Sequence, residues 1–230
     1  WKPWVLVALH ALKIDGGAHL KLRVSGSSIR ASGRLDDKAM TPGELHSLPQ
    51  PDLQLTRPVV LVGLMGAGKT TTGRRLAQRL KVSFADADDA VEEAAGMSVS
   101  DIFEVYGEEE FREGERKVMA RLISEGPSVI AAGGGAFIND ETRTLVKEKA
   151  LSVWLKADLE THVRRTALRD TRPILRRGNP RDILAKLIKE RSPYYAEADM
   201  VVESRDGPHQ DVAEDIIQAL VAFEAQGGQT

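Results

Sequence analysis

The sequence predicts an α/β fold in which a parallel β-sheet is covered by helices on both faces. From Arg57 onward, short apolar segments alternate with longer segments whose apolar residues recur at helical spacing. This alternation is typical of parallel sheets, because each crossover connection lays a helix against the sheet. At 230 residues, the chain is long enough for one such domain with an additional segment. Ligands of these folds bind at the carboxyl ends of the strands.

The expected elements alternate along the chain. The strand candidates are Val59–Leu64, Val82–Ala85, Ser128–Ala132, Ser152–Leu155 and Met200–Glu203. The helix candidates lie near 69–80, 88–95, 99–106, 108–125, 140–149, 158–169, 180–196 and 209–224. We therefore expect a five-stranded parallel sheet.

The junction between the first strand and the first helix carries a phosphate-binding pattern. Residues 63–70 read Gly-Leu-Met-Gly-Ala-Gly-Lys-Thr, between the β-favouring run Val59–Val62 and an amphipathic helix at 71–80. Glycines here let backbone N–H groups surround phosphate oxygens, and the helix N-terminus faces the anion. The pattern predicts a nucleotide-binding P-loop rather than a plain turn. Its expected nucleotide contacts are Gly63, Gly66, Ala67, Gly68, Lys69, Thr70 and Thr71.

Lys69 and Thr70 have separate expected roles in this loop. Lys69 is placed to reach the terminal phosphates, and the Thr70 hydroxyl is placed to ligate Mg²⁺. The loop thus predicts the phosphate donor and its metal ion but leaves the phosphate acceptor open.

Two carboxylates, Asp86 and Asp88, directly follow the second strand. If the strand persists, their two-residue spacing points both side chains the same way, so one can serve the metal and the other the substrate. A carboxylate that orients a hydroxyl and takes its proton favours phosphoryl transfer to an alcohol. The alternative is that Asp88 or Asp89 only caps the following helix.

Arginines and glycines further along the chain suggest a site for an acid. Arg112 lies beside an apolar helical stripe, one turn from Glu115, which can hold its guanidinium group. The alternative is a surface ion pair. Gly133–Gly135 ends the third strand, where a close backbone approach to a ligand and a flexible turn explain the glycines equally well. Arg191, late in its helix, could join Arg112 in binding a carboxylate.

The segment 164–181 contains seven arginines, punctuated by Pro173, Gly178 and Pro180. Such a segment suggests a mobile lid that brings arginine, with Arg172 the candidate, to the transferring phosphate and excludes water. The alternative is a solvated basic loop. Together, the motifs predict transfer of a phosphoryl group to a small hydroxylated acid.

Six motifs, in this order and spacing, resemble those of shikimate kinase over about residues 57–222. They are Gly63–Thr70, Asp86-x-Asp88, Phe111-Arg112, Gly133-Gly134-Gly135, Arg172-Pro173-Ile174-Leu175 and Arg191-Ser192-Pro193-Tyr194-Tyr195. The resemblance implies a transferase that uses ATP and Mg²⁺ to phosphorylate the 3-hydroxyl of shikimate, on the chorismate route to aromatic amino acids. It also implies a P-loop kinase fold with five parallel strands and a closing lid.

The resemblance further implies roles for single residues. In the nucleotide half, Lys69 would contact the transferred phosphoryl group, Thr70 would ligate Mg²⁺ with support from Asp86, and Arg172 would be the lid arginine on the phosphates.

In the acceptor half, Asp88 would bind and activate the hydroxyl group. Arg112, Arg191 and the backbone of Gly134 would hold the carboxylate, and the flanking glycines would shape that turn. Two alternatives stay open: a gluconate kinase, and a non-catalytic sensor domain that resembles shikimate kinase.

Bulk properties limit the remaining function classes. The net charge of −2 and pI near 6.3 give no electrostatic case for nucleic acid or an anionic membrane. The chain has no cysteine, which excludes disulfides and thiolate catalysis and fits a reducing compartment. The apolar stretch Trp4–Leu12 is too short to span a bilayer. We expect a cytoplasmic monomer that binds ATP and shikimate.

Residues 1–56 differ from the rest of the chain, and the kinase-like domain is expected at 57–230. This N-terminal extension shows no sustained helical or strand period, and Pro49-Gln50-Pro51 near its end is linker-like. We expect it to be disordered or non-native, with Met40 a candidate start. The alternative is a targeting peptide. Transit peptides are poor in acidic residues, so Asp15, Asp36 and Asp37 argue against one.

Overall fold

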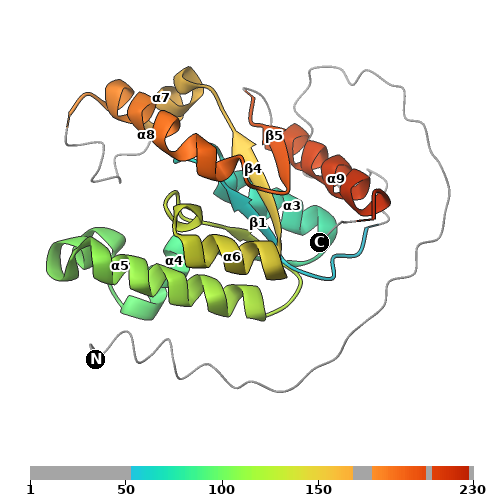
Figure 1. The fold of residues 1–230 in the computed structure, drawn as a ribbon, viewed down its shortest axis with the longest axis horizontal. Helices are drawn as coiled ribbons and strands as arrows, with labels where there is room; N and C mark the ends of the chain where they lie inside the picture. The colour runs from blue at the N-terminus through green and yellow to red at the C-terminus, as the bar shows by residue number, and fades with distance from the viewer. Residues whose placement is uncertain (1–52, 168–177, 206–208, 228–230) are drawn as a thin grey trace.

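A computed structural model describes residues 53–167, 178–205 and 209–227, which form a sheet between two layers of helices (Figure 1). The elements in chain order are β1 (Val59–Val62), α3 (Lys69–Leu80), β2 (Ser83–Asp86), α4 (Ala87–Ala95), α5 (Val99–Ser124), β3 (Ser128–Ala131), the 3₁₀ helix η1 (Ala136–Ile138), α6 (Asp140–Lys149), β4 (Leu151–Lys156), α7 (Leu159–Ala167), α8 (Pro180–Tyr195), β5 (Met200–Glu203) and α9 (His209–Ala225).

The sheet has the strand order β2-β3-β1-β4-β5, and every neighbouring pair is parallel. The central strand β1 pairs with β3 on one side, where Val60 lies opposite Ile130, and with β4 on the other, where Val60 lies opposite Ser152. All four residues of β1 are buried, as expected for a strand covered on both faces. The predicted five-stranded parallel sheet is confirmed.

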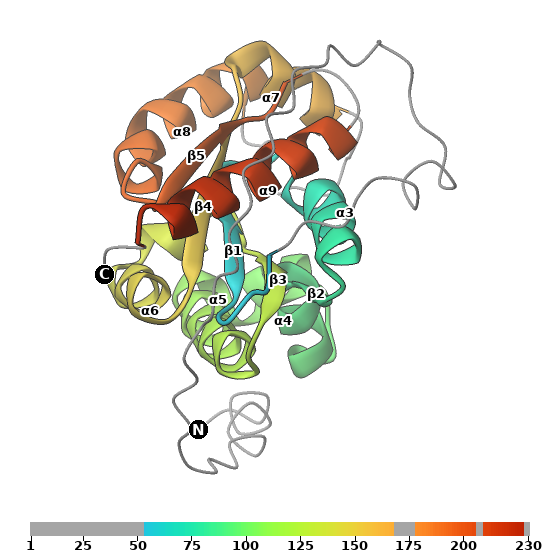
Figure 2. The same ribbon diagram turned by 90° about the vertical axis from the view of Figure 1, so that its right-hand side faces the viewer.

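Alternate residues of β1 point to two separate apolar clusters. Val60 and Val62 join a cluster that includes side chains of α4, α5, α6 and α8. Val59 and Leu61 face the opposite cluster, which includes side chains of α3 and α9. Figure 2 shows α9 lying across the sheet in front of β1 and β4. The two clusters hold the sheet rigidly between helices, so the loops at its carboxyl edge start from fixed positions.

Element boundaries differ from the predicted ones where the backbone changes conformation. β1 ends at Val62 rather than at residue 64, because Gly63 has a φ of +135°. The predicted break between two helices at 99–106 and 108–125 is present inside α5, where Gly107 has a φ of 83° and a ψ of 176°. A glycine can adopt that non-helical conformation without steric cost.

The condition under which Asp86 and Asp88 would point the same way, that the strand persists to Asp88, is not met. β2 ends at Asp86, and Asp88 lies in the first turn of α4. Asp86 caps this helix, because its side chain accepts a hydrogen bond from the backbone N–H of Asp88. The strand therefore gives way to a helix between the two carboxylates.

The packed core begins before Arg57, the predicted start of the domain. Leu53 is buried in the cluster under α3 and α9, and Leu55 packs against the same cluster. The rest of the predicted N-terminal extension, residues 1–52, lies outside the described residues. No helix among the described residues is long and apolar enough to cross a membrane.

Candidate active site

The loop between β1 and α3 has the backbone conformation that its glycines permit. Gly63, Gly66 and Gly68 all have positive φ values, of 135°, 80° and 89°. A Cβ atom at Gly63 would lie 2.7 Å from the backbone oxygen of Leu155, so a side chain there would collide with β4. Gly68 is the N-cap of α3, which aims the N–H groups of the helix N-terminus at the loop. The predicted anion-binding geometry is therefore present.

Lys69 lies against this loop and is largely buried. Its Nζ atom donates hydrogen bonds to the carbonyl oxygens of Gly63, at 2.8 Å, and Leu64, at 3.2 Å. Only 9% of the residue is exposed. These bonds hold the ammonium group beside the loop backbone, where it can meet a terminal phosphate.

Thr70 and Asp86 meet at the carboxyl edge of the sheet. The Thr70 hydroxyl donates a hydrogen bond of 2.7 Å to Oδ2 of Asp86, and Oδ1 of Asp86 accepts the backbone N–H of Asp88 at 3.0 Å. The structure thus brings together the hydroxyl and the carboxylate that are the predicted Mg²⁺ ligands. Both are hard oxygen groups of the kind that Mg²⁺ prefers.

Asp88 and Glu115 converge on Gly133. A Cβ atom at Gly133 would overlap Oε1 of Glu115 and would lie 2.8 Å from Oδ1 of Asp88. Glu115 is 3% exposed, and burial raises the pKa of its carboxyl group, while the charge of Arg112 lowers it and that of Asp88 raises it. Only a glycine at 133 leaves room for both carboxylates.

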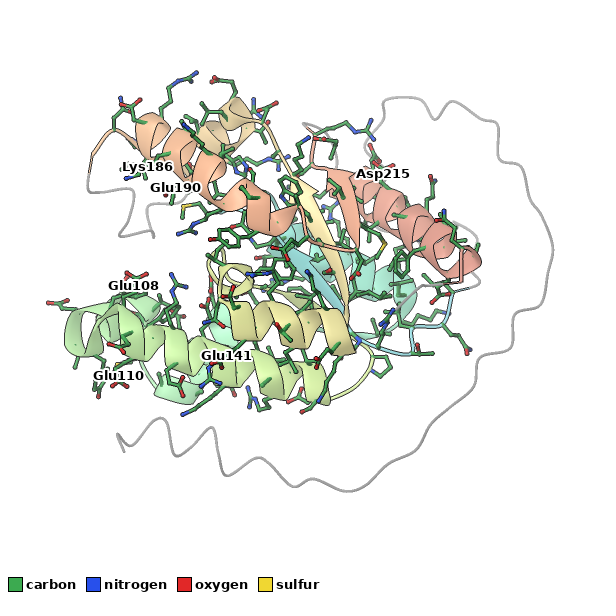
Figure 3. All side chains as sticks on the ribbon, in the orientation of Figure 1. Glu108, Glu110, Glu141, Lys186, Glu190 and Asp215 are labelled. Carbon is green, nitrogen blue, oxygen red and sulfur yellow. The ribbon has the colours of Figure 1, made fainter. Side chains whose placement is uncertain are left out.

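Arg112 is the ionic partner of Glu115, as their spacing predicts. Its Nη1 donates to Glu115 at 2.7 Å, and its Nη2 donates to Glu108 at 3.3 Å. Burial lowers the pKa of Arg112, but the charge of Glu115 and the bonds to both glutamates outweigh it, so the pKa is raised and the group stays charged. In Figure 3, Glu108 lies on the side of α5 that faces α8.

The glycine turn at 133–135 lies between the two arginines. A Cβ atom at Gly135 would overlap the Arg112 guanidinium, and Nη1 of Arg191 donates to the Gly134 carbonyl oxygen at 2.9 Å. The protein's own charged side chains thus approach the turn closely, which explains Gly133 and Gly135 better than flexibility does. Arg112 and Arg191 thus both lie at this turn, and their joint binding of a carboxylate stays a prediction.

A cavity of about 190 Å³ connects the phosphate loop with this turn. It opens at the carboxyl ends of β1, β2 and β3, the edge at which parallel sheets bind ligands. Its lining residues are Gly66, Gly68, Lys69, Thr70, Thr71, Asp86, Asp88, Ala131, Ala132, Gly134, Arg165, Thr166 and His209.

Side chains of α7 that contact the phosphate loop were not predicted from the sequence. Nδ1 of His162 donates to the Met65 carbonyl oxygen at 2.7 Å, and the His162 side chain is almost fully buried. Burial lowers the pKa of His162, so the neutral imidazole is favoured, with its proton on Nδ1. The Thr166 hydroxyl donates to the His162 carbonyl at 2.7 Å. A single histidine in an amphipathic helix gave no signal of this contact.

Arg165, also on α7, supports the same loop. Its Nη1 donates to the Ser204 hydroxyl at 2.9 Å, and Ser204 in turn donates to the Ala67 carbonyl at 2.8 Å. The arginine-rich composition of 164–181 indicated this region but suggested a lid. Arg165, near the start of that segment, lies on α7 and lines the cavity, and the lid itself stays a prediction. Arg172, the predicted lid arginine, lies outside the described residues.

Comparisons with known proteins give the family. The model of the shikimate kinase family matches residues 65–221. The curated shikimate kinase of Caulobacter vibrioides is 54% identical over 162 residues, covering 70% of this chain and 81% of that protein. The shikimate kinase of Rhodopseudomonas palustris is 49% identical over 164 residues, covering 71% and 81% respectively.

A solved structure of shikimate kinase from Acinetobacter baumannii, in complex with shikimate, superposes with a TM-score of 0.72 at 36% identity. The superposed region covers 76% of this chain and 98% of the Acinetobacter baumannii chain. A gluconokinase from Sinorhizobium meliloti shares the fold, with a TM-score of 0.54 and 14% identity. The chain belongs to the shikimate kinase family.

Proposed function

We propose that this enzyme transfers the γ-phosphoryl group of ATP to the 3-hydroxyl of shikimate, giving shikimate 3-phosphate and ADP in the chorismate route to aromatic amino acids. The observation that carries the proposal is one cavity with two chemically different ends. One end is a glycine loop with a buried lysine, suited to phosphates. At the other end, Asp88 and Gly134 line the cavity, and Arg191 and Arg112 adjoin the glycine turn.

The donor half would hold ATP through the loop N–H groups and Lys69. Thr70 and Asp86 would hold Mg²⁺, which would supply positive charge beside the phosphates. Among the described residues there is no cluster of three or more His, Cys, Asp or Glu side chains that could hold a metal ion. That fits Mg²⁺, which is bound through one or two carboxylates together with substrate phosphates and water.

The acceptor half would hold shikimate by its carboxylate. Arg112 and Arg191 are charged donors on either side of the glycine turn, and paired arginines match the planar geometry of a carboxylate. The backbone at Gly134, between Gly133 and Gly135, would complete this grip. Glu115 keeps the Arg112 guanidinium in place before the acid arrives.

Asp88 would bind the 3-hydroxyl and accept its proton as the oxygen attacks the γ-phosphorus atom. Its position supports this role, because it lies between the metal residue Asp86 and the acceptor residues Glu115 and Gly133. Arg172 would cover the phosphates, exclude water and stabilise the transferring group. We also propose that the enzyme acts as a cytoplasmic monomer, without nucleic-acid or membrane partners.

The test is ATP-dependent ADP release with shikimate, gluconate and other small hydroxy acids offered separately. We expect turnover with shikimate only. Turnover with gluconate alone would favour the gluconate kinase alternative. Tight shikimate binding with no ADP release would favour the sensor domain, although Lys69 and Asp88 both line the cavity in positions suited to catalysis.

A further inference from the structure

We propose that Tyr195 is a positioning residue for the acceptor half, because its hydroxyl fixes the peptide between Gly134 and Gly135. This inference rests on the proposed function. Tyr195 is the last residue of α8 and is 2% exposed. Its hydroxyl donates a hydrogen bond of 2.6 Å to the Gly134 carbonyl oxygen.

The Gly134 oxygen accepts two hydrogen bonds from one helix face. Arg191 lies four residues before Tyr195, so both side chains project from the same side of α8. Nη1 of Arg191 donates to the same oxygen at 2.9 Å. One of these donors is therefore a proposed carboxylate ligand, whereas the other is a neutral phenol.

The orientation of this carbonyl sets the orientation of the rest of the peptide. A trans peptide is planar, so the N–H group of Gly135 points away from the carbonyl oxygen of Gly134. Gly135 in turn lies against the guanidinium of Arg112. Rotation of this one peptide would shift the groups that face both arginines.

Tyr195 suits this task better than Arg191 does. Arg191 would share its guanidinium with the incoming carboxylate, which leaves the phenol as the constant donor to Gly134. Burial raises the pKa of Tyr195 to about 12, so the hydroxyl remains a donor across neutral pH. The ring packs against Trp154, with centroids 5.9 Å apart, which fixes where the hydroxyl points.

A separate contact holds the 3₁₀ helix η1, which follows the turn. Arg143 on α6 donates to the carbonyl oxygens of Phe137, at 3.2 Å, and Ile138, at 3.1 Å, at the end of η1. Loss of the Tyr195 hydroxyl should therefore loosen one peptide without unfolding the whole segment.

The test is Tyr195→Phe, which keeps the ring and removes the hydroxyl. We expect the KM for shikimate to rise about five-fold, as for a lost hydrogen bond of ~1 kcal/mol. The kcat and the KM for ATP should change by less than about two-fold. Tyr194→Phe is the matched control, because Tyr194 is adjacent and 37% exposed, and we expect wild-type constants.

The same assay keeps this inference separate from the proposed function. Wild-type turnover of shikimate tests the function, and the ratio of Tyr195→Phe to wild type tests the tyrosine, on whichever hydroxy acid the wild type uses. Calorimetric titration of each protein with that acid gives the same ratio for binding. An unchanged acceptor KM and affinity in Tyr195→Phe would overturn the inference, as would an equal loss for ATP.

Discussion

The two halves of the site are built in different ways. The nucleotide half is nearly continuous in sequence, and its main groups come from the backbone of residues 63–70 and the side chain of Lys69. The acceptor half is assembled from α4, α5, the turn after β3, and α8. A phosphate needs many N–H donors, which one loop can supply, whereas a hydroxy acid needs a base and cations at a distance from each other.

The halves also differ in electrostatics. In the acceptor half, Glu115 is buried beside Asp88, and its charge is balanced by Arg112. The nucleotide loop is supported mainly by hydrogen bonds to its carbonyl oxygens, from Lys69, His162 and Ser204. Substitutions in the two halves should therefore produce different kinetic signatures.

The largest effect is expected for Asp88→Asn. Loss of the proton acceptor should lower kcat by about 10²- to 10⁴-fold, while ATP binding stays nearly intact. Steady-state kinetics combined with ATP titration by calorimetry measures both quantities. A kcat close to that of the wild type would show that Asp88 is not the proton acceptor and that the acceptor half does not supply the base.

Arg112→Ala should raise the KM for shikimate by roughly 10- to 100-fold, because a charged hydrogen-bonding pair to the carboxylate is lost. Arg112→Lys keeps a cation beside the buried Glu115, so it separates substrate binding from the stability of the pair. Arg116→Ala, on the same helix, is the control, since Arg116 pairs with Glu113 and Glu141. If ATP affinity fell instead, the two halves would be assigned the wrong way round.

The smallest effect is expected behind the nucleotide loop. His162→Ala removes the hydrogen bond to Met65 and should raise the KM for ATP about five-fold, with the KM for shikimate unchanged. His162→Asn retains an N–H donor close to the Nδ1 position and should recover most of the loss. Equal effects on both substrates, or no recovery with asparagine, would show that α7 does not act through the loop.

The same comparison explains what could be predicted from sequence. The P-loop was predictable because its chemistry is local: three glycines with positive φ, a lysine and a threonine lie between a strand and a helix. The pairing of Arg112 with Glu115 was predictable too, because residues three apart are neighbours on a helix.

Long-range contacts could not be predicted. His162 and Met65 are 97 residues apart, Ser204 and Ala67 are 137 apart, and Tyr195 and Gly134 are 61 apart. A single histidine, serine or tyrosine in the sequence does not indicate which distant residue it will hydrogen-bond. The change from strand to helix near these carboxylates was predicted, because the expected strand ended at Ala85 and the expected helix began near residue 88. The identity of the cap was not predicted, since capping was assigned to Asp88 or Asp89 and Asp86 provides it.

Identification of the product by ³¹P and ¹H NMR tests the central claim most directly. Wild-type enzyme with ATP, Mg²⁺ and shikimate should yield ADP and a single new phosphate ester at the 3-hydroxyl, in equal amounts. Phosphorylation at another hydroxyl, or ADP formation that does not depend on shikimate, would contradict the proposal that Asp88 in the cavity and two arginines beside the glycine turn present that hydroxyl to the phosphate loop.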